Sequence, residues 1–63
     1  MDREEPVRVA RTLINRHGIR AGAVAEERII EARLAGNAAE LDLWQAVQLA
    51  IAEFRRTTPR NAA

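Results

Sequence analysis

The sequence lacks cysteine, lysine and tyrosine, and it contains a single histidine. Without cysteine, the chain has no means of forming disulfides or thiolate metal sites. A single histidine leaves little for a nucleophile and base pair, and no glycine-rich loop is present to bind a phosphate. We therefore expect a protein that is not an enzyme, with no catalytic residues, no cofactor, no metal site and no evident small-molecule ligand.

The chain is also short, since 63 residues allow one domain at most. A domain of this size buries only about 60% of the surface that its unfolded chain exposes. Apolar residues make up 48% of the sequence and charged residues 30%, which favours a folded domain over a disordered one. Its stability is therefore marginal, and good helix packing or self-association is the expected source of additional stability.

Excess charge of one sign is absent too. Ten arginines stand against nine acidic residues, for a formal net charge of +1. A chain with such balanced charge is not strongly attracted to nucleic acid or to anionic lipid. No apolar run approaches the roughly 20 residues that span a bilayer, and the charged start has no apolar segment of a secretory signal behind it. We expect a cytoplasmic protein that does not enter a membrane.

Two glycines, Gly18 and Gly36, divide the chain into three segments with helical periodicity. The pattern predicts an all-α fold in which helices near residues 3–16, 20–35 and 38–56 form an antiparallel bundle with short glycine-containing turns, a bundle that dimerisation could complete. A helical hairpin that dimerises into a larger bundle is the main alternative. Residues 1–56 are expected to form a single helical domain, and 57–63 a flexible C-terminal tail.

The first segment opens either with a capping box formed by Asp2 and Glu5 or with Glu5 as a cap before Pro6. Gly18 is expected to end this helix in a left-handed conformation, with Ile19 making the hydrophobic contact that often accompanies such a stop. This helix is expected to have one broad apolar face, which consists of Val7, Val9, Ala10, Leu13, Ile14 and His17.

The lone histidine, His17, is interpreted as structural rather than catalytic. Because it falls on the apolar side just before the glycine stop, we expect its ring to pack there and to bond a terminal carbonyl.

Acidic residues of the second segment, Glu26, Glu27 and Glu31, are interleaved with arginines. They are interpreted as a solvated, self-neutralising face rather than as a carboxylate site.

The second segment has a wide apolar sector rich in alanine, which allows close approach of a neighbouring helix. This helix is expected to lie between the other two. Asn37 is expected to cap the third helix, with Glu40 three residues later completing a capping-box-like pair.

The third segment has the clearest stripe, predicted to carry the core and made up of Leu41, Leu43, Trp44, Val47, Ala50, Ile51 and Phe54. The indole N–H of Trp44 is expected near the edge of the core, where an acceptor can reach it. Leu49 falls on the opposite side of this helix, flanked by Gln45 and Ala52. It is either an ordinary exposed leucine or part of an interface, and the candidate interface residues are Leu49, Gln45, Ala52 and Trp44.

Nucleic-acid binding is the alternative, because the segment from Arg28 to Val47 superficially resembles a helix-turn-helix. The face that such a motif would offer to DNA carries Asp42, Gln45, Leu49 and Glu53. An acidic and apolar set of this kind suits phosphates poorly. Nucleic acid is therefore not the expected partner.

Four stretches carry a resemblance to a known family, namely residues 13–18, 25–28, 35–37 and 44–51. Together they resemble a family of short, uncharacterised helical proteins of alphaproteobacteria, a domain of unknown function, over nearly the whole chain from Ala10 to Phe54. The resemblance implies a bacterial, cytoplasmic helical domain and no functional residues. Ile19 departs from the acidic or polar residue expected after the His-Gly stop, so that an exposed cap becomes a packed one.

From these patterns we expect a small, non-enzymatic protein–protein interaction module that acts through its helix faces. Its expected partner is a second copy of the chain, in a homodimer, or another protein. A small nucleic-acid-binding regulator is the alternative function.

Overall fold

The computed structural model describes residues 4–57, and their backbone is helical almost throughout. Helix α1 spans Glu4–His17, a short 3₁₀ helix η1 spans Gly18–Arg20, α2 spans Ala21–Ala35 and α3 spans Ala38–Thr57. Helical backbone therefore runs from α1 into α2 with only η1 between them. No strand occurs within residues 4–57, and the all-α prediction is confirmed for this part of the chain.

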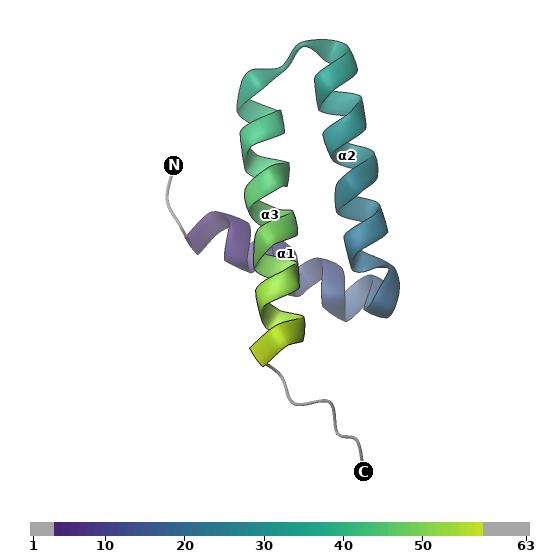
Figure 1. Cartoon of the computed structure of the whole chain (residues 1–63), viewed down its shortest axis with the longest axis vertical. Coiled ribbons are helices and arrows are strands. Elements are labelled where there is room, and N and C mark those ends of the chain that lie inside the picture. The colour runs from purple at the N-terminus through teal and green to yellow at the C-terminus, as the bar shows by residue number, and fades with distance from the viewer. Residues whose placement is uncertain (1–3, 58–63) are drawn as a thin grey trace.

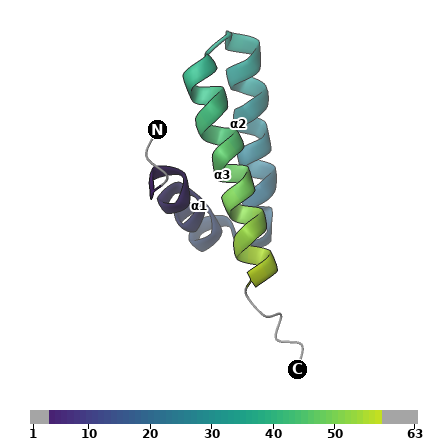
Figure 2. The same ribbon diagram turned by 60° about the vertical axis from the view of Figure 1, so that its left-hand side comes forward.

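The helices are arranged as a hairpin with a crossing helix. Figure 1 shows α2 and α3 side by side and antiparallel, with α1 running across one end of the pair. The turned view in Figure 2 keeps α2 against α3 and places α1 on one side of this hairpin. The far half of the hairpin extends beyond α1, so the three helices do not line up as a regular antiparallel bundle.

Helix α3 is the central element, because both α1 and α2 pack mainly on it. The prediction that the helix near 20–35 lies between the other two is therefore wrong. The physical reason is side-chain size, since the buried positions of α2 are mostly alanine whereas α3 supplies large apolar side chains. The core is formed by Ala10, Ala21, Ala25, Val47 and Ile51, with half-buried Val9, Leu13, Ile14, Leu43, Trp44, Ala50 and Phe54 around them.

Both glycine stops are confirmed by left-handed backbone, with φ of 59° at Gly18 and 68° at Gly36. At the second stop the N–H of Gly36 donates to the carbonyl of Arg33 at 3.1 Å, and the N–H of Asn37 donates to the carbonyl of Ala32 at 2.9 Å. This pair of bonds is the Schellman motif, which satisfies carbonyls that the helix end leaves without partners.

Two predictions beside the first stop are wrong. Ile19 is 89% exposed and packs on nothing in the core, and His17 is exposed and makes no capping hydrogen bond with its side chain. All of residues 15–20 are exposed, because they form the outer side of the corner at which α1 turns through η1 into α2. What this corner does supply is the carbonyl of Ile19, which accepts a 2.9 Å hydrogen bond from Nη2 of Arg55.

The predicted boundaries near the two ends of the chain need one correction, at Thr57. Thr57, expected to begin the tail, belongs to α3, and its hydroxyl donates to the carbonyl of Glu53 at 2.9 Å. The remainder of the expected tail, 58–63, lies outside the described residues, as does Asp2 of the expected capping box. The helix that was expected to begin near residue 3 begins at Glu4, two residues before Pro6.

The start of α3 confirms Asn37 as its cap. Oδ1 of Asn37 accepts a 3.0 Å hydrogen bond from the backbone N–H of Glu40. The reciprocal half of a capping box is not formed, since the carboxylate of Glu40 accepts from Trp44 instead.

Replacing the cap tests this contact. We expect Asn37→Ala to reduce the free energy of unfolding by about 1 kcal/mol, because the donor at position 40 loses its acceptor. Asn37→Asp, which keeps an acceptor oxygen, is the matched control and should retain most of the stability. Thermal melts followed by circular dichroism measure both, and equal losses in the two variants would show that the cap contributes nothing.

Candidate interaction surface

The outer side of α3 is the candidate site, and it is set by the helical period. The core stripe of α3 fixes which way the helix faces, with Val47 and Ile51 buried. Residues about half a turn away must then face solvent. Along this exposed side five residues follow one another at spacings of three and four, namely Asp42, Gln45, Leu49, Ala52 and Arg56, and Glu53 is exposed beside them. We call these five residues the outer stripe of α3.

Leu49 is the apolar centre of the outer stripe and is 69% exposed. It lines a shallow depression of about 260 Å³ between the start of α1 and the middle of α3, with Pro6, Val7, Ala46, Ala50 and Glu53. Val7 is itself 38% exposed. Two large apolar side chains from different helices therefore meet at one open, concave place. Surfaces of this kind are typical of sites that contact another chain.

A second depression continues along the same side toward the end of α3. It is lined by Val7, Arg11, Ala50, Glu53, Phe54 and Thr57. The guanidinium of Arg11 lies over the ring of Phe54, 5.4 Å from its centroid. An arginine from α1 thus covers the half-buried aromatic ring of α3, and the apolar surface left open on this side is centred on Leu49.

Three of the four candidate interface residues share this side, and the fourth does not. Leu49, Gln45 and Ala52 are exposed, whereas Trp44 is half-buried and packs against the core cluster. The sequence did not indicate that Pro6 and Val7 lie beside Leu49. Val7 belongs to the apolar side of the first segment, but no pattern in the sequence shows where α1 crosses α3.

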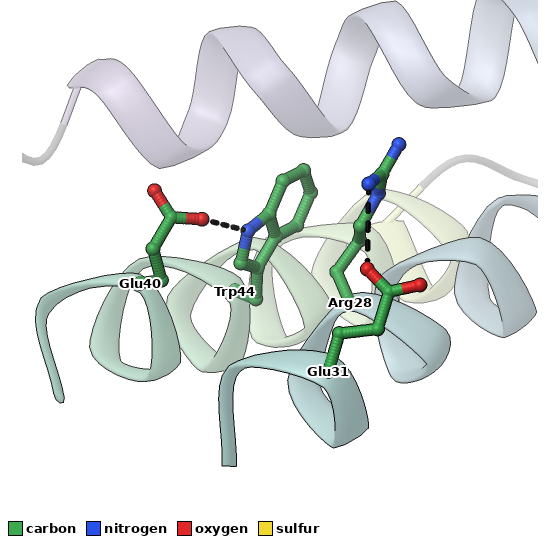
Figure 3. A network of polar contacts seen from close by, with 4 residues as sticks. All are labelled: Arg28, Glu31, Glu40 and Trp44. Atoms are coloured by element: carbon green, nitrogen blue, oxygen red, sulfur yellow. Dashed lines mark hydrogen bonds and ion pairs between the residues drawn. The ribbon is translucent and has the colours of Figure 1, made fainter. Parts of the chain in front are cut away.

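Trp44 belongs to a different, polar surface of the hairpin. Its Nε1 donates a 3.0 Å hydrogen bond to Oε1 of Glu40, which confirms the expected acceptor. From α2, the guanidinium of Arg28 lies 5.8 Å from the ring centroid of Trp44 and 3.5 Å from Oε1 of Glu31. Figure 3 shows the indole and the guanidinium extending from their two helices in the same direction.

This polar set of side chains is self-contained. The indole donor has its acceptor, and the arginine has both a carboxylate and an aromatic partner. The pair formed by Arg28 and Glu31 agrees with the interpretation of the acidic residues of α2 as a self-neutralising face. Exposed pairs of this kind contribute little to stability. We therefore assign the network to the packing of α2 against α3 rather than to chemistry.

Helix α2 presents a second exposed apolar area, formed by Ile30 and Leu34. These side chains stand one turn apart, and Leu34 is 84% exposed. Neither lines any of the depressions beside α1 and α3. Because Ile30 and Leu34 lie on α2 and outside those depressions, this area serves as the comparison for the outer stripe of α3.

Residues 4–57 contain no group of three or more histidine or acidic side chains placed to hold a metal ion. Over the same residues, no helix combines the length and the apolar character that crossing a bilayer requires.

Comparisons of the chain with protein-family models, with curated proteins and with solved structures give no match. The resemblance to a family of alphaproteobacterial helical proteins therefore stays a prediction.

Proposed function

We propose that this protein is a small, non-enzymatic interaction module that associates with itself through the outer side of α3. The observation that carries the proposal is the open apolar centre at Leu49, which the crossing of α1 over α3 places beside Val7. Covering this surface with a second chain would remove two large apolar side chains from water, at about 25 cal/mol per Å² of apolar area buried.

The composition of the core supports self-association. Three of the core residues with no exposed surface are alanines, and Val47 is the largest side chain that is fully buried. A domain with so few large buried side chains has little apolar burial to offset the conformational entropy lost on folding. Apolar area buried in a dimer adds to that of the single chain, because a folded domain is stabilised by any partner that binds only its folded form.

Dimerisation would also provide the bundle that one chain does not form. In one chain, α1 crosses one end of the hairpin and leaves most of the outer side of α3 without a neighbour. A helix from a second copy placed there would give α3 a partner on each side, as in a four-helix bundle.

The nucleic-acid alternative gains no support from the arrangement of the helices. In a helix-turn-helix the two helices cross at about 90–120°, whereas α2 and α3 lie side by side as a hairpin. Their exposed outer side carries Asp42 and Glu53, which would face the phosphates.

Replacing Leu49 with aspartate tests the surface. Because a fully buried leucine contributes about 1.5–3 kcal/mol and each 1.4 kcal/mol is a factor of ten, we expect Leu49→Asp to raise the dissociation constant of the dimer by at least about tenfold. Light scattering after size-exclusion chromatography measures the change. The matched control is Leu34→Asp, the same replacement at an exposed leucine of α2, which should leave association unchanged.

The opposite pattern, in which only Leu34→Asp disrupts the dimer, would move the interface to α2. A dimer unaffected by either variant would remove the outer side of α3 from the proposal.

A further inference from the structure

The outer stripe of α3 has a charge pattern that is complementary to itself. Leu49 lies at its middle, Asp42 seven residues before it and Arg56 seven residues after it. Seven residues are close to two full helical turns, so all three project from the same side of α3. One end of the outer stripe is thus acidic, the other end basic and the centre apolar, with the exposed carboxylate of Glu53 beside the stripe between Leu49 and Arg56.

Both charged ends are open to a partner. Asp42 and Arg56 are exposed, and within residues 4–57 neither takes part in an ion pair. The adjacent Arg55 differs, because it reaches across to the carbonyl of Ile19 and ties the end of α3 to η1. The two arginines at the end of this helix therefore have different surroundings, and Arg56 is the one that faces outward.

We infer that the partner is a second copy of the chain, whose α3 lies antiparallel on the first with a twofold axis near Leu49. This register rests on the self-association proposed above and specifies its geometry. Under a twofold axis at Leu49, residue 42 of one copy lies opposite residue 56 of the other, and the reverse holds as well. Two ion pairs between Asp42 and Arg56 then flank a central contact between the two Leu49 side chains.

The neighbouring residues suit this register. Position 46 of one copy lies opposite position 52 of the other, and both are alanine. Small side chains beside the axis allow the two helices to approach closely. Position 45 lies opposite position 53, where the amide of Gln45 can donate to the carboxylate of Glu53. A parallel pair would instead place Asp42 against Asp42 and Arg56 against Arg56, and like charges in contact disfavour it.

A charge exchange tests the register. In Asp42→Arg, both ion pairs become repulsive, and we expect the dissociation constant of the dimer to rise about tenfold. Arg56→Asp should have the same effect. The double variant Asp42→Arg with Arg56→Asp restores both pairs in reverse order and should return to within about threefold of the unmodified chain. Sedimentation equilibrium measures all four proteins, and Glu27→Arg on α2 controls for the gain of positive charge in Asp42→Arg.

Each outcome of this series decides one point. Weakening in both single variants with recovery in the double variant supports the register. If the chain dimerises but the single variants behave like Glu27→Arg, the register is overturned and self-association stands. If the unmodified chain stays monomeric, the register and the proposed function are both overturned.

Cross-linking gives a second measurement that does not depend on ion pairs. The chain has no cysteine, so a single introduced thiol can form a disulfide only with the same thiol in a second copy of the chain. A disulfide requires Cα atoms within about 7 Å, and the axis places the two copies of position 49 together. At about 1.5 Å of rise per residue, the two copies of position 42 are roughly 21 Å apart along the helix.

With a mild oxidant, Leu49→Cys should therefore form a covalent dimer at low protein concentration, and Asp42→Cys should not. Cross-linking at both positions would indicate parallel helices and overturn the register, as would a dimer that cross-links at neither.

Discussion

Ala25→Asp is expected to unfold the chain, whereas Ala23→Asp is expected to leave it folded. Ala25 has no exposed surface and belongs to the core cluster, while Ala23, two residues earlier on α2, is exposed. Burying a carboxylate without a partner costs several kcal/mol, which is a large part of the roughly 5–15 kcal/mol that stabilises a typical folded protein. Both positions lie within α2, so burial is the main difference between the variants, and the first turn of the helix also favours an acidic side chain at position 23.

Circular dichroism at room temperature and thermal melts distinguish these two variants. The expected result is loss of most helical signal in Ala25→Asp and a melting transition near that of the unmodified chain in Ala23→Asp. Two similar transitions would contradict the burial of Ala25 in the core cluster.

Alanine replacements at two glycines are expected to change stability in opposite directions. Gly36 has φ of 68°, a conformation that costs a residue with a Cβ about 1–2 kcal/mol. Gly22 lies inside α2 without a positive φ, and a Cβ added there would meet Nη1 of Arg55 at 3.7 Å, an ordinary contact. Alanine in place of a helical glycine stabilises by about 0.5–1 kcal/mol.

The two variants should therefore differ by about 2 kcal/mol in the free energy of unfolding, a large gap for so short a chain. A domain of this size shifts its melting temperature by about 4–8 °C for each kcal/mol. Gly36→Ala should melt below the unmodified chain and Gly22→Ala above it. A lower melting temperature for Gly22→Ala would show that its Cβ disturbs the hydrogen bond between Arg55 and Ile19.

Local signals in the sequence account for the helices and their ends. Gly18 and Gly36 predict the stops because glycine takes a left-handed φ without the steric cost of a Cβ. Asn37 predicts the start of α3 because its side chain replaces a missing acceptor. The stripe around Val47 and Ile51 predicts the buried side of α3, and the same period predicts that Leu49 is exposed. Each of these predictions depends on residues within a few positions of one another.

The arrangement of the helices depends on contacts between residues far apart in the sequence, and the sequence patterns did not predict those contacts. Ile19 was expected to pack against the stop beside it, but the corner into α2 turns its side chain outward and uses its carbonyl to hold Arg55, 36 residues later. The place of α3 between the other helices follows from the relative sizes of side chains on three faces. Helical periodicity reports which residues face inward and carries no information on which helix they meet.

The candidate site likewise has one part that helical periodicity predicts and another part that depends on how the helices pack. Periodicity alone places Leu49, Gln45 and Ala52 on a common outer face, and it places Trp44 in the core stripe, where the structure has it half-buried against the core cluster. The contribution of Val7 depends on the angle at which α1 crosses α3, which no local pattern encodes. Of the apolar depression around Leu49, the half on α3 could be predicted and the half on α1 could not.

Sedimentation equilibrium of the unmodified chain, over micromolar to millimolar concentrations, tests the central claim most directly. The proposed interaction through the outer stripe of α3 predicts a reversible rise of the apparent mass from one chain to two, without larger species, because a twofold contact closes on itself. A single-chain mass over the whole range, with the helices intact by circular dichroism, would contradict it.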